Sequence, residues 1–488
     1  MNKTQFANSF RLQGCLQGIA CAGLLWAGSV AGMTLVQFNF STNTLQIRLV
    51  LPSDHATRVY KGVFLSAPGS GGGFLDTGVP GVSRAQCLDY ALIGLSGLVY
   101  TYPNLKWVLE EAARRSGHPE LATAPIIPYG WSAGALNTSL AAAMISRRMV
   151  FYFGGAGDFQ SQPYETAFVP VSGFQMNGEL DNNTFTSLQT LLIGLASTPN
   201  DGLFGGRDSY RARVPPEDNP LLAPAGAMAL WYETHPNPVW GTHQGAEFAY
   251  YAASEVLKAR RALAGGDVVS TNGFVEYPPL VVSNGWLGQI QDFLTGTITQ
   301  QITTNGRGII VTNTIISHGS APYGRKIKRV QIASYGTYTD NVDRASWMVN
   351  EKVAHIYRAM MSFYGAYARY NGTAGNSPAC IIDLPKEHFL QQGDPVSFMV
   401  DLRRFGAGAG ISNVTCYLNL EEQGVLTAPN IAGQFYRFAF PAPEKGVHAI
   451  LIRATDNTGD ISECFRTLFI HAPANEAPGK AAGLWPAN

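Results

Sequence analysis

The residues best suited to chemistry lie at positions 130–134, Gly130-Trp131-Ser132-Ala133-Gly134, and match the pattern G-x-S-x-G. An apolar run at 126–129 precedes them and an alanine-rich stretch to about residue 146 follows. A chain with 53 glycines can match the pattern by chance. A strand, a sharp turn and a helix in this order nevertheless favour a catalytic serine, presented where a helix N-terminus stabilises negative charge. Ser132 is therefore the candidate nucleophile of an acyl-transfer reaction.

A serine hydroxyl attacks only when a base removes its proton, so the chain should also supply a histidine. After a turn of this kind the usual order is serine, acid, histidine. His118 precedes Ser132 and is disfavoured by that order. His235 and His243 both follow a predicted strand at 227–233. We favour His243, because it lies in a tight loop that opens directly into a helix, and keep His235 as the alternative.

The histidine in turn needs a carboxylate that holds its tautomer and stabilises the imidazolium. A predicted strand at 168–176 is followed by a loop that contains Asp181, and an acid after a late strand suits this role. Asp181 is the first choice. The other candidates are Glu179, Asp201 and Asp208, and a solvated loop acid without a catalytic role is the plain alternative.

An oxyanion hole in this geometry takes one backbone N–H from the residue after the nucleophile, Ala133, and one from a loop after an early strand. The glycine-rich segment 68–73 is such a loop, and Ser70 is its candidate donor. The segment lacks the spacing and the Lys-Ser/Thr pair of a nucleotide-binding loop. No cofactor is implied, and no cysteine or histidine cluster has the spacing of a zinc site.

The elements that must position these residues alternate between strands and helices from about residue 34 to 265. Such alternation predicts an α/β fold in which a mostly parallel sheet is covered by helices. Beyond those already given, the sequence predicts strands at 63–66, 90–94 and 149–153 and helices at 104–115 and 247–263.

Residues 60–263 resemble the α/β-hydrolase superfamily. The segment Ser116-Gly117-His118-Pro119-Glu120-Leu121, followed by Ala124-Pro125 and the serine motif, is similar to a branch of secreted bacterial esterases and dienelactone-hydrolase-like enzymes. Residues 178–181 resemble the loop that carries the acid in that family. The resemblance implies a serine hydrolase that uses Ser132, Asp181 and His243.

The remainder of the chain divides into a middle region and a β-rich region. Residues 266–382 have no clear architecture, although 298–314 looks like a strand and 350–363 like an amphipathic helix. Short strands without helices between them predict a β-sandwich over 386–473, and residues 447–459 resemble the final strands of bacterial immunoglobulin-like modules. These strands are expected at 396–400, 414–420, 436–440 and 448–454, and residues 474–488 are expected to be loose.

Composition limits the partners. Only 14% of residues are charged and 11% are aromatic, which argues against a disordered chain. The formal net charge is zero, so the chain lacks the basic excess of a nucleic-acid-binding protein.

The N-terminus predicts export. Lys3 and Arg11 precede an apolar run at 16–28 and small residues at 29–31, as in a cleaved signal peptide over 1–31. The alternative is an uncleaved anchor or an ordinary buried helix. A secreted or periplasmic location would let two of Cys380, Cys416 and Cys464 form a disulfide.

The sequence thus predicts a secreted serine hydrolase of carboxylic esters, whose substrate is an ester-containing small molecule, an acylated polysaccharide or a polyester. A serine peptidase or amidase would use the same residues. A third alternative is a non-catalytic hydrolase fold that binds carbohydrate, with polysaccharide contacted through the C-terminal module.

Overall fold

The structure is a computed structural model. It describes residues 33–42, 45–69, 73–74, 77–78, 79–96, 102–131, 134, 148–155, 173–178, 225–230, 244–266, 277–278, 280–290, 297–304, 310–317, 330–339, 345–362, 378–383, 389–404, 410–431, 435–457, 459 and 461–472.

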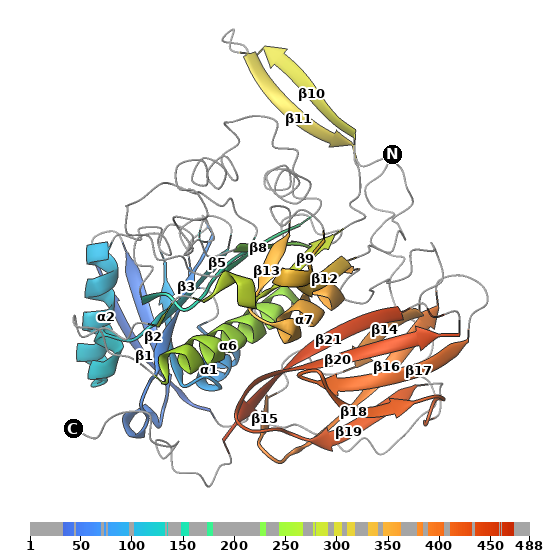
Figure 1. Cartoon of the computed structure of the whole chain (residues 1–488). Coiled ribbons are helices and arrows are strands. Elements are labelled where there is room, and N and C mark those ends of the chain that lie inside the picture. The colour runs from blue at the N-terminus through green and yellow to red at the C-terminus, as the bar shows by residue number, and fades with distance from the viewer. Residues whose placement is uncertain are drawn as a thin grey trace, which may run out of the picture.

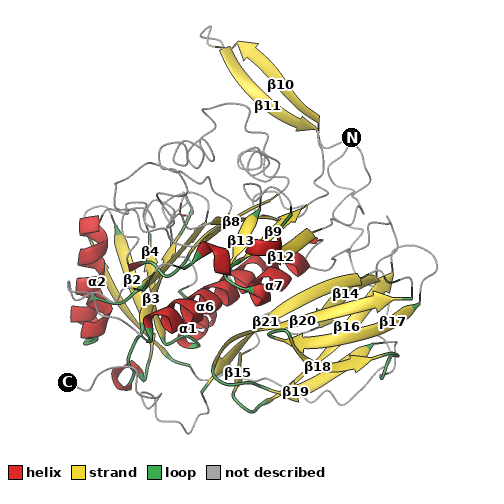
Figure 2. Cartoon of the chain, in the orientation of Figure 1, coloured by secondary structure: helices red, strands yellow, loops and turns green. Residues whose placement is uncertain are grey.

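An eight-stranded sheet organises the N-terminal half of the chain, in the order β1-β2-β4-β3-β5-β6-β7-β8 (Figures 1 and 2). β1 and β2 form an antiparallel pair, and β2 is antiparallel to β4. From β4 to β8 every neighbouring pair is parallel. In chain order, strands β1 to β8 are Leu35–Ser41, Gln46–Pro52, Gly62–Ala67, Tyr90–Leu95, Ile126–Trp131, Tyr152–Gly155, Gly173–Gly178 and Ala225–Leu230.

Helices cover both faces of this sheet, which confirms the predicted α/β class. Successive strand residues point to opposite faces, and in β3 Phe64 joins one apolar cluster while Val63 and Leu65 join the other. The Phe64 face is covered by α1 (Val79–Gln86) and α6 (Gln244–Ala264), and the opposite face by α2 (Tyr102–Ser116). Apolar strands buried on both faces are typical of parallel sheets.

The middle region contains two separate groups of strands. β9 (Trp286–Ile290) lies between β12 (Val330–Ser334) and β13 (Ser346–Met348) in a small antiparallel sheet. The stretch over 298–314 that looks like a strand in the sequence contains two strands, β10 (Thr297–Thr304) and β11 (Ile310–Ser317), which pair antiparallel. A turn-forming Asn-Gly pair at 305–306 separates the two runs in the sequence and was the signal for a hairpin. The predicted helix over 350–363 is present as α7, Glu351–Ser362.

Two β-sheets form the C-terminal region, one in the order β14-β16-β19 and the other in the order β15-β21-β20-β17-β18. They enclose one apolar core, to which Phe398 contributes from the first sheet and Ile450 and Ile452 from the second. This is the two-sheet packing of a β-sandwich. In chain order, strands β14 to β21 are Pro378–Asp383, Phe389–Gln391, Pro395–Arg404, Ile411–Leu418, Glu421–Leu426, Tyr436–Pro441, Gly446–Asp456 and Ile461–His471. Strand β14 therefore precedes residue 386, where the sandwich was predicted to begin.

The sandwich and the α/β unit share a hydrophobic core. The cluster that contains Phe64 and the α6 residue Phe248 continues through Tyr357 of α7 to Leu451 of β20 and Phe465 of β21. Helix α6 therefore packs against the parallel sheet on one side and the five-stranded sheet of the sandwich on the other (Figure 1).

The strand registers exclude one of the disulfides that the sequence allowed. Cys416 of β17 lies opposite Ile452 of β20, and Ile452 lies opposite Cys464 of β21. Two strand spacings separate the cysteine Cα atoms by roughly 10 Å, beyond the roughly 7 Å limit for a disulfide. Cys416 and Cys464 therefore do not bond to each other.

The predicted signal segment 1–31 lies outside the described residues. In the part of the chain that the structure describes, no helix is both long and apolar enough to cross a membrane.

Candidate active site

The parallel strands bring the ends of several predicted catalytic segments to one edge of the sheet. Parallel strands all run the same way, so their C-terminal ends meet at a common edge, called here the carboxyl edge. At this edge Ala67 of β3 is in register with Gly130 of β5, and Gly178 of β7 is in register with Leu230 of β8. The loops that follow these residues contain the residues predicted to do the chemistry.

Gly134, the last residue of the serine motif, is closely packed against the end of β3. Strand β5 ends at Trp131 and helical backbone is present at Gly134. A Cβ atom at Gly134 would overlap with the carbonyl oxygens of Ala67 and Pro68. Only glycine fits at this approach, as expected for a residue two places after the serine of such a turn.

The predicted site residues themselves lie outside the described residues: Ser132, Ala133, Ser70, Asp181 and His243. The elements beside them fix where each segment leaves the sheet. Ser132 directly follows β5, Ser70 comes three positions after β3 ends, and Asp181 comes three positions after β7 ends. His243 immediately precedes α6. The alternatives Glu179, Asp201, Asp208 and His235 also lie outside the described residues.

His118, which the chain order disfavours as the base, lies at the opposite edge, called here the amino edge. It is buried between the end of α2 and the start of β5. Its Nδ1 donates to Oε1 of Glu120 at 3.0 Å, and its Nε2 shares a hydrogen bond of 3.1 Å with Nδ1 of His55. The same Glu120 oxygen accepts the backbone N–H of Tyr60 at 3.1 Å.

The surroundings of His55 favour its neutral form. Burial lowers the pKa of His55, and the neighbouring His118 lowers it further because two imidazolium ions at this distance would repel. The cluster lies at the amino edge, and strand β5 separates it from the serine motif at the carboxyl edge.

Helix α6, which carries the candidate base at its N-terminal end, is anchored along its length. Near its C-terminal end the buried guanidinium of Arg260 donates to the carbonyl oxygens of Met149 at 2.6 Å, Val150 at 3.0 Å and Tyr277 at 2.7 Å. Burial lowers the pKa of Arg260 to about 10. These bonds tie α6 to the segment that leads into β6.

The first turn of α6 is fixed by the sandwich. Oε1 of Glu247 accepts from Arg466 at 2.9 Å and Oε2 accepts from the backbone N–H of Thr467 at 3.0 Å. The Thr467 hydroxyl donates to the Glu247 carbonyl oxygen at 2.9 Å. Burial raises the pKa of Glu247, although Arg466 and the Thr467 N–H act in the opposite direction.

Sequence reasoning missed the buried contact of Glu247 with the sandwich at the start of α6. Glu247 lies four positions after His243, and its partners are 219 and 220 positions further along the chain. The available signal was a lone carboxylate in the apolar run of residues 245–253, which requires a buried partner.

The described part of the chain contains no candidate metal site. Among these residues no three or more histidine, cysteine, aspartate or glutamate side chains are grouped so that they could hold an ion.

Comparisons with known proteins gave structural similarity alone. No family model matches the chain, and no curated protein matches it. The structure is similar over 46% of the chain to 98% of FphF, the fluorophosphonate-binding serine hydrolase F of Staphylococcus aureus, at 11% identity and a TM-score of 0.29. It is similar over 46% of the chain to 97% of a dienelactone hydrolase of Anabaena variabilis, at 15% identity and a TM-score of 0.27.

A further similarity involves 19% of the chain and 97% of the fibronectin(III)-like modules of Clostridium thermocellum CbhA, at 18% identity and a TM-score of 0.16.

Proposed function

We propose that this protein is a serine hydrolase of the α/β-hydrolase type that cleaves carboxylic esters, and that it acts after export from the cell. The observation that carries the proposal is the close packing of Gly134, which has helical backbone three positions after β5 ends, on Ala67 and Pro68. A parallel sheet that delivers G-x-S-x-G to its carboxyl edge in this way is suited to expose a serine hydroxyl for attack.

In the proposed acylation step the Oγ atom of Ser132 attacks the ester carbonyl carbon while His243 removes the hydroxyl proton. The resulting oxyanion accepts hydrogen bonds from the backbone N–H groups of Ala133 and Ser70. When the C–O bond breaks, the leaving alcohol takes the proton from His243 and the acyl group stays on Ser132.

Deacylation repeats the same steps with water as the nucleophile. His243 removes a proton from water, the hydroxyl adds to the acyl carbon, and the proton returns to Ser132 as the carboxylic acid leaves. Asp181 holds the imidazole in the required tautomer in both halves of the reaction. Contacts of α6 with Arg466 and Met149 at its two ends support a fixed position for the segment that begins after His243.

Labelling with a fluorophosphonate tests the proposal directly. We expect the intact mass of the wild-type protein to increase by one probe adduct, because an activated serine attacks phosphorus and expels fluoride. Ser132→Ala should abolish labelling and His243→Ala should slow it. Ser116→Ala is a matched control, since the Ser116 hydroxyl already donates to the carbonyl oxygen of Ala112 at 2.7 Å, far along α2.

A folded wild-type protein that takes up no probe would overturn the proposal and favour the non-catalytic alternative. An amide substrate hydrolysed faster than the matching ester would instead favour the peptidase or amidase.

A further inference from the structure

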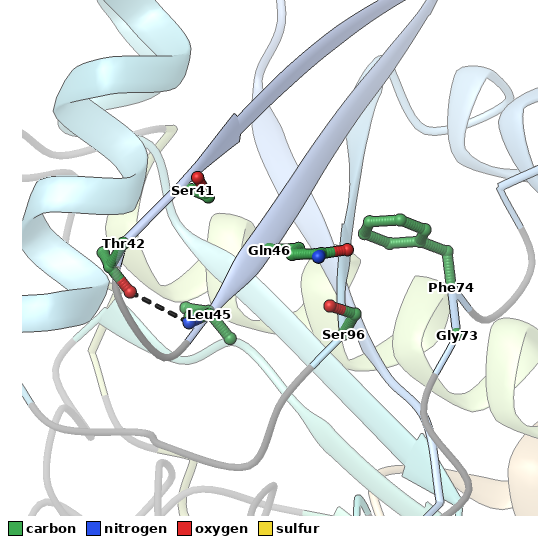
Figure 3. Close-up of a pocket in the computed structure, with 7 residues that line it drawn as sticks. All are labelled: Ser41, Thr42, Leu45, Gln46, Gly73, Phe74 and Ser96. Carbon is green, nitrogen blue, oxygen red and sulfur yellow. Dashed lines mark hydrogen bonds between the residues drawn. The ribbon is translucent and has the colours of Figure 1, made fainter.

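An open hollow lies beside the candidate active site, at the end of the sheet where β1 and β2 join β4 (Figure 3). Its volume is about 350 Å³, at the lower end of the roughly 300–1,000 Å³ of small-molecule sites. It is lined by Ser41, Thr42, Leu45, Gln46, Gly73, Phe74 and Ser96.

The hollow and Ser132 belong to the same edge of the sheet. Ser96 lies one position beyond β4, two positions after Gly94, which is in register with Ser66 of β3. Ser132 lies one position beyond β5, two positions after Gly130, which is in register with Ala67. Because one strand separates β4 from β5, the hollow begins roughly 10 Å from the serine motif, about the span of one ring and its linking atoms.

The aromatic wall of the hollow is held in place from two sides. The guanidinium carbon of Arg48 lies 4.1 Å from the centroid of the Phe74 ring, and Arg48 also donates to Asn39 at 3.1 Å. Beside one edge of the ring is Gly94, where an added Cβ atom would lie 3.2 Å from Cδ1 of Phe74 and 2.5 Å from Cγ2 of Thr77. The glycine therefore makes the space in which Phe74 can lie over the end of β4.

The lining has a definite chemical character. None of the seven described lining residues is charged. Three carry hydroxyl groups and one carries an amide, and these groups both donate and accept hydrogen bonds. Figure 3 shows the amide of Gln46, the hydroxyl of Ser96 and the ring of Phe74 around the same space.

We propose that this hollow binds a neutral sugar unit, which forms the alcohol side of the ester that Ser132 cleaves. The proposal rests on the proposed function. A pyranose ring presents hydroxyl groups at its rim and a C–H face that can lie on an aromatic ring, whose face carries partial negative charge. Gln46 and Ser96 would bind the hydroxyl groups, and Phe74 would carry the C–H face.

The test compares two esters that share an acetyl group: methyl 6-O-acetyl-glucopyranoside and 4-nitrophenyl acetate. Phe74→Ala should raise the KM for the sugar ester tenfold or more, and should raise the KM for the nitrophenyl ester by a clearly smaller factor. Gln46→Ala, a change at an exposed side chain, should raise the KM for the sugar ester severalfold.

Phe38→Ala is the matched control. Phe38 is also a partly buried phenylalanine with a ring contact, a T-shaped pair with His55 at 5.6 Å, but it lies outside the hollow. It should leave the KM for the sugar ester unchanged.

Calorimetric titration of Ser132→Ala with the sugar ester separates a failure of this proposal from a failure of the proposed function. Binding that is lost when Phe74→Ala is added supports the sugar site even if the wild-type protein hydrolyses neither ester. Equal KM values for wild-type and both hollow variants, equal losses on both esters, or calorimetric binding that Phe74→Ala does not weaken would overturn it.

Discussion

The two edges of the parallel sheet are built from different kinds of residue. At the carboxyl edge small residues lie at or next to the ends of β3, β5, β6 and β7: Ala67, Gly130 one position before the end of β5, Gly155 and Gly178. At the amino edge charged and aromatic side chains pair closely, as in the cluster of His118, Glu120 and Tyr60. One edge leaves room for loops that carry reactive groups, and the other is fixed by side chains.

The sandwich adds to the fixed edge. Asp89 precedes β4 and forms ion pairs with Lys61 at 2.8 Å and with Lys445, which comes directly before β20. Both lysines lower the pKa of Asp89 against the opposing effect of burial. Close by, the thiol of Cys87 lies 3.6 Å from Nε2 of His471, at the end of β21. The comparison predicts that changes at the amino edge alter stability alone, whereas changes at the carboxyl edge alter catalysis.

The largest effects are expected from two buried carboxylates that both contact β21. Glu247 bonds Arg466 at the start of α6, and Glu463 bonds Arg358 of α7 at 2.9 Å and Arg453 at 3.0 Å. Glu247→Gln or Glu463→Gln leaves arginine charge without its buried partner, so each should lower the free energy of unfolding by about 3–5 kcal/mol. Urea unfolding measures both.

Only one of these two variants should change catalysis. Because Glu247 fixes the turn that follows His243, Glu247→Gln should lower kcat by about tenfold under conditions where the protein remains folded. Glu463→Gln should leave kcat within twofold. Equal kcat losses in both variants would contradict a specific role for Glu247 in positioning the base.

Two glycines test the comparison at opposite edges. Gly134→Ala places a Cβ atom against Ala67 and Pro68, which must displace the serine turn, and a misplacement of about 1 Å can reduce kcat by about 100-fold. Gly117 at the amino edge has a φ of +77° and open space around its Cα. Gly117→Ala should therefore lower the free energy of unfolding by about 1 kcal/mol and leave kcat unchanged. A larger kcat loss in Gly117→Ala than in Gly134→Ala would reverse the assignment of the edges.

The pattern of apolar residues in the sequence was sufficient to predict the strands and helices around the site. It was insufficient to predict the contacts between them. Apolar runs gave β3, β4 and β5, because strands buried on both faces need little besides apolar side chains. The strand predicted over 149–153 is β6 at Tyr152–Gly155, since Met149 forms only an isolated bridge to Ile126. The ends of a strand depend on its pairing with neighbouring strands, and the residues of the strand itself do not reveal that pairing.

Long-range pairing explains what the sequence concealed. The bond between Glu247 and Arg466 joins residues 219 positions apart, and the sugar-binding hollow combines residues from β1, β2 and the segments after β3 and β4. Neither shows in the spacing of any one segment. The choice of Ser132, by contrast, depended on five adjacent residues and the two elements that flank them.

A smaller effect is expected from pH. Burial lowers the pKa of His471 and of His355 to about 4, so both are neutral in the folded protein. The unfolded chain binds a proton at each histidine near pH 6.5, which means that the unfolded state gains protons first as the pH falls. Stability should be fully present above pH 6.5 and decline towards pH 4, by up to roughly 1.4 kcal/mol per pH unit for each histidine.

Urea midpoints between pH 7 and pH 4.5 measure this decline. His355→Asn should reduce its slope, because the amide oxygen can accept from Arg358 in place of Nδ1, which now accepts at 2.8 Å, and does not titrate. A midpoint in the wild-type protein that does not change across this range would show that neither histidine is held neutral by burial.

The smallest effect is expected from Glu120→Gln at the amino edge. One oxygen of Glu120 accepts both the His118 imidazole N–H and the Tyr60 backbone N–H, and a glutamine oxygen can accept the same two bonds. The variant therefore removes charge and little else, and should lower the free energy of unfolding by about 1 kcal/mol or less. Because this cluster lies at the far edge from Ser132, kcat and its pH profile should match those of the wild-type protein. A tenfold fall in kcat, or a displaced pH profile, would place the His118 cluster in the catalytic machinery and remove the distinction between the two edges.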